Sequence, residues 1–413
     1  MKYDETGVNL LENMNKNKNL LILSIANADF VKKYKRKDLL SQDLNGYFKK
    51  VHYVFLVEKP FKPYTEKIDD TYTILYLSNK RFAWLQRGKL RHLNTALSLV
   101  YNLLYLRHYT VKNGISVLFA QEPFIRGSLA YAISKITGKP YVVEVCSNFK
   151  NKHWEEGRLE LPILKTVDHE KRLLRFTLLH ANGVMADRDN YWNDGIIPHE
   201  LGDRYFRYHF SMEEAHYSPP ENRINLKPKY NAINKKIVLY IGRLIQEKRS
   251  EDLSLIAKEL FSNNDLPDTV MWIVGDGPLK QYLKEEIGNH GLSHKVLFIE
   301  SQPTAAVADF LSTADVVIAP HAGWVIPECQ LAETPIVVYD FEWHKEGVAD
   351  GKYGMLVPYR DAKAMAQAAK DVLLFPDKYK AMMKEARQWV LQNNTLDREV
   401  ADKLKIYKTV LGE

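Results

Sequence analysis

The sequence KKIVLYIGRLIQEK, residues 235–248, decides the fold class expected for this chain. An apolar run at 237–241 ends at Gly242, and Arg243 and Lys248 follow before an amphipathic segment. Ligands of open α/β sheets bind at the carboxyl ends of the strands, and two cations there suit a diphosphate. The segment therefore predicts a parallel sheet that binds a nucleotide-linked ligand.

Length and composition indicate a globular protein of two domains. The chain has 413 residues, which suits two cores of roughly 200 residues each better than one. Hydrophobic residues make up 46% and charged residues 26%, as in soluble proteins. The two cysteines, Cys146 and Cys329, cannot build a disulfide framework, so we expect a cytoplasmic setting. The N-terminal segment lacks the apolar core of a signal peptide, and no apolar run approaches the ~18 residues that cross a bilayer.

Positive charge is concentrated in the first part of the chain. Residues 1–150 carry 24 Lys and Arg against 12 Asp and Glu, which leaves 34 against 39 in the remainder. This excess indicates an anionic partner such as a membrane surface or a phosphorylated lipid, or else a solvated charged face. Nucleic acid is disfavoured, because no groove-reading or stacking module accompanies lysine bursts such as 32–37.

Strand-like and helix-like runs alternate along the whole chain, which predicts an α/β fold of two Rossmann-like, doubly wound domains facing a cleft. A stretch rich in proline and asparagine, 219–236, indicates a linker between a first domain at 1–218 and a second at 237–390. Residues 391–413 are expected to form a terminal helix, and its packing against the first domain is left open. The expected strands are 19–25, 50–57, 71–77, 115–120, 141–145, 181–186, 237–242, 269–275, 295–300, 315–320, 335–340 and 354–358.

Two further segments of the second half end strands near the expected ligand. In IVGDGP, residues 273–278, the glycines let the backbone approach a ligand, or they form only a tight strand-to-helix turn. In KVLFIES, residues 295–301, the backbone can bracket a base, although a plain core strand explains the sequence equally well.

The segment 319–338 combines a strand end with a helix start. A helix is expected from Pro327, because proline is favoured in the first turn and free N–H groups there bind phosphate. Glu328 in that turn can accept hydrogen bonds from a ribose, or it can simply complement the helix dipole. The loop between strand and helix contains His321, Ala322, Gly323 and Trp324.

In this order the segments resemble the nucleotide-binding domain of GT-B glycosyltransferases, family 4 in particular, over about 236–390. YIGRLIQEK resembles the family's phosphate motif, IVGDGPLKQYL its GxGP turn, STADVVIAP its later strand, and ADGKYGMLVPYRDAKAMAQAA a segment beyond it. The resemblance implies a nucleotide-diphospho-sugar donor bound without a metal. It implies that Arg243 and Lys248 hold the diphosphate and stabilise the leaving group, and that Glu328 holds the ribose.

The chain departs from the family pattern at two places. Glu328 fits the second glutamate of the family's Glu-x7-Glu motif, but Pro320 stands at the place of the first. The loop is similar in part to the shorter loop of sugar-nucleotide epimerases of the same fold. In the first half, ISVLFAQEP and GKPYVVEVCSN resemble the acceptor domain, where Cys146 replaces the family's histidine.

The resemblance implies a transferase that moves a sugar from a UDP- or GDP-sugar to a glycan or lipid-linked acceptor, with retention, in bacterial polysaccharide assembly. The alternatives are an epimerase or hydrolase of the same fold, and a non-catalytic nucleotide-sugar-binding subunit. Residues 80–109, with Phe82 and Trp84, indicate contact with an anionic membrane, or a packed core helix; a location at the inner face of the membrane is left open. The expected donor-binding residues are Gly242, Arg243, Lys248, Gly275, Asp276, Gly277, Phe298, Ile299, His321, Ala322, Gly323, Trp324 and Glu328. The acceptor-side candidates are Asn27, Glu122, Arg126, Cys146 and Asn148.

Overall fold

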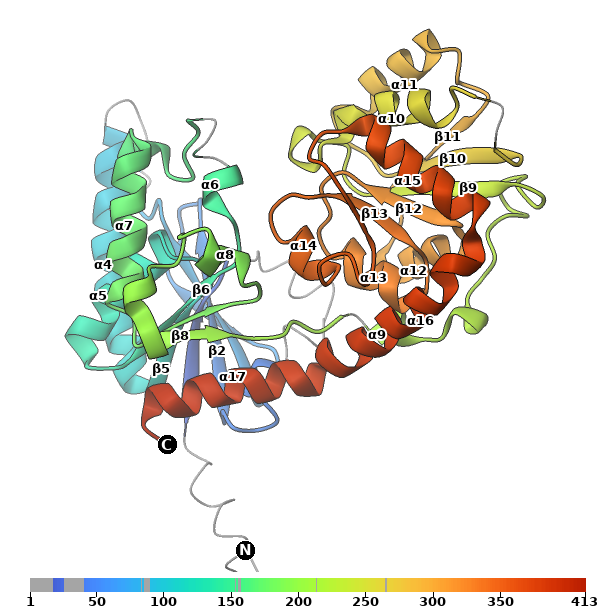
Figure 1. Cartoon of the computed structure of the whole chain (residues 1–413). Coiled ribbons are helices and arrows are strands. Elements are labelled where there is room, and N and C mark those ends of the chain that lie inside the picture. The colour runs from blue at the N-terminus through green and yellow to red at the C-terminus, as the bar shows by residue number, and fades with distance from the viewer. Residues whose placement is uncertain are drawn as a thin grey trace, which may run out of the picture. The chain divides into compact units, whose positions relative to one another are not determined.

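The computed structural model of the chain (Figure 1) describes residues 18–25, 41–82, 84, 90–152, 154, 157–212, 214–263 and 266–413. The chain forms two compact units. The first comprises residues 1–210 and 396–413, and the second comprises residues 211–395. The C-terminal end of the chain is thus part of the first unit. The boundary between the two units lies between residues 210 and 211, whereas the sequence predicted the end of the first domain at 218.

The first unit contains an eight-stranded sheet in the order β3-β4-β2-β1-β5-β6-β7-β8 within its described residues. All neighbouring strands are parallel except β3 and β4, which form an antiparallel pair at one edge. The strands are β1 (Asn19–Leu23), β2 (Lys50–Val57), β3 (Tyr64–Lys67), β4 (Tyr72–Ser78), β5 (Ile115–Ala120), β6 (Tyr141–Val145), β7 (Gly183–Ala186) and β8 (Tyr205–Arg207).

Helices cover both faces of this sheet. On one face α4, α5 and α7 bury apolar side chains against alternate strand residues, which point to the same side of a pleated sheet. On the other face the terminal helix α17 packs so closely that a Cβ at Gly183 would lie 2.9 Å from Val410. The helices are α4 (Leu90–Lys112), α5 (Ile125–Thr137), α6 (Phe149–Lys152), α7 (Val167–Leu179), α8 (Asn190–Asn193) and α17 (Leu396–Leu411).

The second unit is a doubly wound domain around a parallel six-stranded sheet, in the order β11-β10-β9-β12-β13-β14. Successive residues of its strands enter two separate cores, one under α10, α11 and α15 and the other under α12 and α13 (Figure 1). The strands are β9 (Lys236–Ile241), β10 (Thr269–Val274), β11 (Val296–Ile299), β12 (Val316–Ala319), β13 (Ile336–Tyr339) and β14 (Met355–Val357). The helices are α9 (Glu214–Tyr217), α10 (Leu253–Leu260), α11 (Lys280–Asn289), α12 (Thr304–Thr313), α13 (Val325–Leu331), α14 (His344–Gly347), α15 (Ala362–Leu374) and α16 (Pro376–Asn393). Short 3-10 turns complete both units at Ser41–Asp43, Pro162–Leu164, His199–Arg204, Pro220–Asn222, Gln246–Lys248 and Ser250–Asp252.

Each predicted strand lies within two residues of an observed one, but two strands were missed. β3 is polar and exposed, and β8 has only three half-buried residues; edge strands of this kind lack a clear apolar pattern. The proline-rich stretch expected as a linker is part of the second unit, where Leu226 and Ala232 are buried in one of its two cores.

Candidate nucleotide-sugar site

The turn after β9, which carries both expected phosphate-binding cations, is held by a buried serine. The Ser250 hydroxyl donates to the carbonyl of Arg243 over 3.1 Å and accepts from the N–H of Ile245 over 3.2 Å. The Tyr240 hydroxyl donates to the same Arg243 carbonyl over 2.9 Å. Sequence reasoning missed both residues. Their signal was a serine two residues after Lys248 and a tyrosine two before Gly242.

The glycine turn after β10 lies directly against the turn after β9. Gly275 has φ +147° and Gly277 φ +155°, which L-residues rarely adopt. A Cβ at Gly275 would lie 1.9 Å from the carbonyl oxygen of Gly242, and one at Gly277 2.3 Å from that of Leu244. The backbone carbonyl of Asp276 accepts a hydrogen bond from the N–H of Leu244 over 2.9 Å. These glycines are therefore required by backbone contact between the two turns.

His321 joins the loop after β12 to the turn after β9. Its Nδ1 hydrogen-bonds the carbonyl of Glu247, and its Nε2 lies 3.3 Å from a carboxylate oxygen of Glu342. The amino group of Lys248 lies 3.4 Å from where a Cβ at Gly323 would stand. The structure thus brings the ends of the neighbouring strands β9 and β12 together.

A second histidine fixes the backbone of the same loop. His344 is completely buried, and its Nδ1 donates to the carbonyl of Tyr339 over 2.8 Å. Its Nε2 accepts the N–H of Ala322 over 2.9 Å, which requires the neutral ring. Burial, with a smaller contribution from neighbouring His321, lowers the pKa of His344 to about 3. The Trp343 indole donates to the Ala322 carbonyl over 3.2 Å, so the backbone of Ala322 is held at both its N–H and its carbonyl.

The two expected cations differ in their surroundings. The Arg243 side chain is 64% exposed, and its guanidinium lies 3.8 Å from a carboxylate oxygen of Glu247. Lys248 lies in the 3-10 turn Gln246–Lys248 beside Gly323. Arg243 is thus open to a ligand, while Lys248 lies within the loop cluster.

Glu328 lies in α13, which begins at Val325 and not at Pro327 as the sequence predicted. Proline occupies the third helical position, where its missing N–H costs no intrahelical bond. The Glu328 N–H donates to the Trp324 carbonyl over 3.2 Å, so neither residue 327 nor 328 offers a backbone donor to a ligand. The Glu328 carboxylate lies 3.4 Å from Nε2 of His216 in α9, a buried residue. Burial lowers the pKa of His216 to about 4.

The strand end expected to bracket a base is the edge strand β11. Phe298 is half-buried against one core, and Ile299 is buried in the other. The Ile299 carbonyl accepts the N–H of Gly275 over 3.0 Å. This bond connects the edge of the sheet to the glycine turn, so the ends of β9, β10, β11 and β12 form one continuous rim.

In the first unit, Glu122 and Arg126 form the start of α5. The Glu122 carboxylate accepts the N–H of Phe124 over 2.7 Å and that of Arg126, whose guanidinium lies 3.6 Å away. Burial raises the pKa of Glu122. Both carboxylate oxygens are thus engaged by the helix that follows β5, which is a structural role.

The other acceptor-side candidates follow β6. Cys146 is exposed and forms no disulfide, and its sulfur lies 3.8 Å from the Gln121 carbonyl. Asn148 is buried and donates to a carboxylate oxygen of Asp194 over 2.6 Å. Asn27 lies outside the described residues. Among the residues that the structure describes, no cluster of three or more His, Cys, Asp or Glu could hold a metal, and no helix is long and apolar enough to span a bilayer.

Comparison with known proteins identifies the second unit. Residues 222–389 match the family described as Glycosyl transferases group 1. Alpha-D-kanosaminyltransferase of Streptomyces kanamyceticus is 28% identical over 264 residues, which are 62% of this chain and 67% of that protein. A GDP-mannose-dependent phosphatidylinositol monomannoside mannosyltransferase of Mycolicibacterium smegmatis is 28% identical over 42% of this chain and 48% of its own length. The chain thus spans between about half and two thirds of these two relatives.

Solved structures show the same fold over nearly the whole chain. Sucrose-phosphate synthase of Thermosynechococcus elongatus superposes with a TM-score of 0.71 at 15% identity and covers 96% of this chain and 99% of its own. Anabaena HepE, solved with UDP and glucose, gives 0.66 at 15% identity over 94% and 99%. The two units, each built on a largely parallel sheet, and these matches identify the chain as a glycosyltransferase of the GT-B class whose second unit matches Glycosyl transferases group 1.

Proposed function

We propose that the protein transfers a sugar from a UDP- or GDP-sugar to a glycan or lipid-linked acceptor, with retention at the anomeric carbon and without a metal, in polysaccharide or glycoconjugate assembly. The observation that carries the proposal is the shared rim of β9, β10 and β12, where Arg243, Lys248 and the glycine turn lie within one network of backbone contacts. HepE is solved with UDP and with UDP-glucose, and the mycobacterial relative is named for GDP-mannose. We assign the chain to family 4 on its motifs.

In the proposed reaction, the bond between the anomeric carbon and the diphosphate breaks, and negative charge develops on the leaving oxygen. Arg243 and Lys248 would stabilise that charge, which is the largest electrostatic contribution in sites of this kind. His321 and Ser250 hold the turn that carries the two cations. The cations would therefore be in position before the reaction, and no free energy would be needed to order them during it. Glu328 would accept the ribose hydroxyls, positioned by His216 at 3.4 Å.

The test is a thermal-shift screen against the diphosphates of uridine, guanosine, adenosine and thymidine and their sugars. A ligand that binds only the folded protein raises its stability by RT ln(1 + [L]/Kd), so the correct base gives the largest shift. Turnover of the matching sugar nucleotide is then measured with and without a lipid-linked acceptor. Turnover that does not depend on an acceptor would indicate an epimerase or hydrolase, and binding without turnover a non-catalytic subunit.

We also propose that the first unit contacts an anionic membrane through α4. This helix has an inverted pattern: Asn94, Ser98 and Asn102 are buried, where they hydrogen-bond the end of β4 and the residues that follow it. Leu106 of the same helix is buried in the core, but five other leucines and valines form an outward stripe at spacings of three, four and seven residues. The stripe consists of Leu93, Leu97, Val100, Leu104 and Val111, each 39–65% exposed.

A surface stripe of this kind has a cost in water that a membrane interface removes. Exposed Arg107 on the same stripe adds the positive charge that favours anionic lipid. We expect co-sedimentation with vesicles containing phosphatidylglycerol, and less with neutral vesicles. Leu104→Asp should abolish it, whereas Ile136→Asp, at an exposed apolar residue of α5, should not. Concentration-dependent dimerisation that Leu104→Asp removes, without vesicle binding, would assign the stripe to a second copy.

A further inference from the structure

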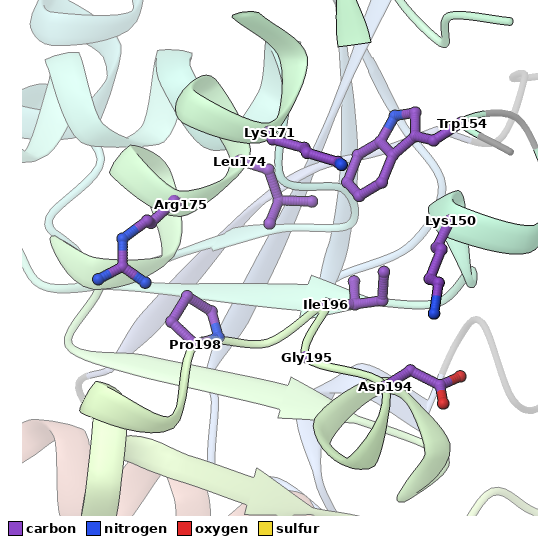
Figure 2. Close-up of a pocket in the computed structure, with 9 residues that line it drawn as sticks. All are labelled: Lys150, Trp154, Lys171, Leu174, Arg175, Asp194, Gly195, Ile196 and Pro198. Carbon is purple, nitrogen blue, oxygen red and sulfur yellow. The ribbon is translucent and has the colours of Figure 1, made fainter. Parts of the chain in front are cut away.

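A basic cavity in the first unit is lined, apart from Asp194, by residues not discussed so far. Its volume is about 420 Å³, within the range of about 300–1,000 Å³ typical of small-ligand sites. Figure 2 shows three cationic side chains and one carboxylate around an apolar floor. The lining residues are Lys150, Trp154, Lys171, Leu174, Arg175, Asp194, Gly195, Ile196 and Pro198.

The cavity is built from segments that follow β6 and β7, together with the side of α7. Lys150 lies in α6 after β6, and Asp194 follows α8 after β7. Asp194 accepts a hydrogen bond from buried Asn148 over 2.6 Å, which ties the two segments together. The carboxyl ends of parallel strands are where open α/β sheets bind ligands.

The aromatic wall of the cavity is held by a hydrogen bond to a buried carboxylate. The Trp154 indole donates to a carboxylate oxygen of Glu170 over 2.6 Å. Glu170 is itself fully buried and accepts the N–H of Leu161 over 2.5 Å. Leu174, Ile196 and Pro198 are buried at the floor. A fixed indole face beside an apolar floor suits the carbon face of a sugar ring, because aromatic walls and a few placed polar groups are what orient such ligands.

The charges of the cavity are not all neutralised within it. Arg175 is paired with Glu200 through both terminal nitrogens, at 3.1 and 2.5 Å. Within the described part of the chain, Lys150 and Lys171 have no carboxylate partner, and Lys171 lies 5.5 Å from the centre of the Trp154 ring. Two ammonium groups near an indole favour an anionic group on the ligand, and the second oxygen of Asp194 can accept sugar hydroxyls.

We propose that this cavity binds a sugar that carries a phosphate or carboxylate group, and that this sugar belongs to the acceptor. The second clause rests on the proposed transferase function; the first does not. Lys150 and Lys171 bind the anionic group, Trp154 stacks on the ring, and Asp194 accepts ring hydroxyls. The first unit thereby selects acceptors that are acidic or phosphorylated glycans.

Isothermal titration of the full chain with glucose 6-phosphate, glucuronate, glucose and inorganic phosphate tests the proposal without a donor. We expect one or both charged sugars to bind at least roughly ten-fold more tightly than glucose and than phosphate. The stronger of the two identifies the anionic group. Equal binding of glucose, or of phosphate alone, would overturn the proposal.

Matched variants locate the site. Lys171→Gln and Lys150→Gln should each weaken binding of the charged sugar roughly ten-fold. The control is Arg172→Gln, which removes the same charge one residue along α7 but lies outside the cavity lining. This variant should bind the charged sugar as tightly as the unmodified protein. UDP and GDP binding, measured on the same preparations, should be unchanged in all three. If the unmodified protein does not bind nucleotides, the proposed function is contradicted and this inference is not. If both lysine variants bind the charged sugar as tightly as the unmodified protein, this inference is contradicted and the proposed function is not.

Discussion

At the scale of single residues, the proposed donor site depends on Lys248. Its amino group lies beside Gly323, at the point where the loop after β12 meets the turn after β9. Lys248→Ala should therefore weaken UDP or GDP binding more than binding of the free nucleoside, and slow transfer on the order of 10²-fold. Calorimetry and initial rates measure both. Lys258→Ala, at an exposed lysine of α10, serves as the control, and equal weakening of nucleoside and diphosphate would remove Lys248 from the phosphate site.

Gly275 provides a prediction about backbone strain. Its φ of +147° and the 1.9 Å approach to the Gly242 carbonyl leave no room for a side chain. Gly275→Ala should lower the free energy of unfolding by more than about 2 kcal/mol and impair nucleotide binding, because the turn must move. Gly288→Ala is the matched control: it lies in α11 with its nearest neighbour at 3.7 Å, and should be neutral or stabilise by about 0.5 kcal/mol. Urea unfolding compares the two.

The buried His344 predicts how stability depends on pH. Its folded-state pKa of about 3 lies below the ordinary value near 6.5, so below about pH 6.5 the unfolded chain takes up a proton that the folded chain does not. The contribution of His344 to the free energy of unfolding is therefore fully present above about pH 6.5, and it decreases as the pH falls towards 3. At about pH 5 the loss is about 2 kcal/mol.

The measurement for His344 is the difference in unfolding free energy between about pH 7 and about pH 5. His344→Asn should reduce that difference by about 2 kcal/mol, since asparagine does not titrate. His216 and His52, whose pKa values burial also lowers to about 4, maintain the rest of the slope. An unchanged slope in the variant would show that His344 is protonated in the folded protein.

At the scale of elements, the terminal helix α17 completes the core of the first unit. Tyr407 is fully buried, with its ring centre 5.0 Å from that of Phe48 in an edge-to-face contact. The N–H of His209, next to the boundary of the unit, donates to a carboxylate oxygen of Asp402 over 3.0 Å. The core of the first unit therefore includes side chains from the C-terminal end of the chain.

Tyr407→Ala should destabilise the first unit by about 3–5 kcal/mol, the cost of removing a large buried aromatic. Lys405→Ala, at an exposed residue of the same helix, should change stability by less than about 0.5 kcal/mol. Hydrogen exchange followed by mass spectrometry reports each unit separately. In Tyr407→Ala we expect faster exchange in β7 and unchanged exchange in β9 and β10. An equal loss of protection from exchange in both units would show that they unfold cooperatively.

At the scale of the whole molecule, the proposed chemistry requires no metal. Transfer should persist in excess chelator, because Arg243 and Lys248 supply the positive charge that a divalent ion supplies elsewhere. Initial rates before and after chelation provide the comparison. Full loss of activity that a divalent ion restores would contradict the metal-free mechanism.

Some parts of the site follow from sequence alone. The strand before Gly242 and the glycines at 275 and 277 have local signatures, namely an apolar run and residues that tolerate unusual φ. The histidine contacts do not: His321 bonds a carbonyl 74 residues away, and His344 bonds the N–H of Ala322. Such pairs depend on which strand ends are neighbours in the sheet, and sequence periodicity carries no information about sheet order.

Sequence by itself determined the alternation of strands and helices, the two-domain class and the positions of the turns after β9 and β10, because each arises from local patterning of apolar residues and glycine. Only the tertiary structure decided that Leu93, Leu97 and Leu104 of α4 are exposed while Asn94 and Asn102 are buried. It also decided that Lys150 and Trp154, from the segment after β6, line one cavity with Lys171 of α7. The physical reason is the same in both cases: a helical period marks two faces, and the neighbours supplied by distant parts of the chain decide which face is covered.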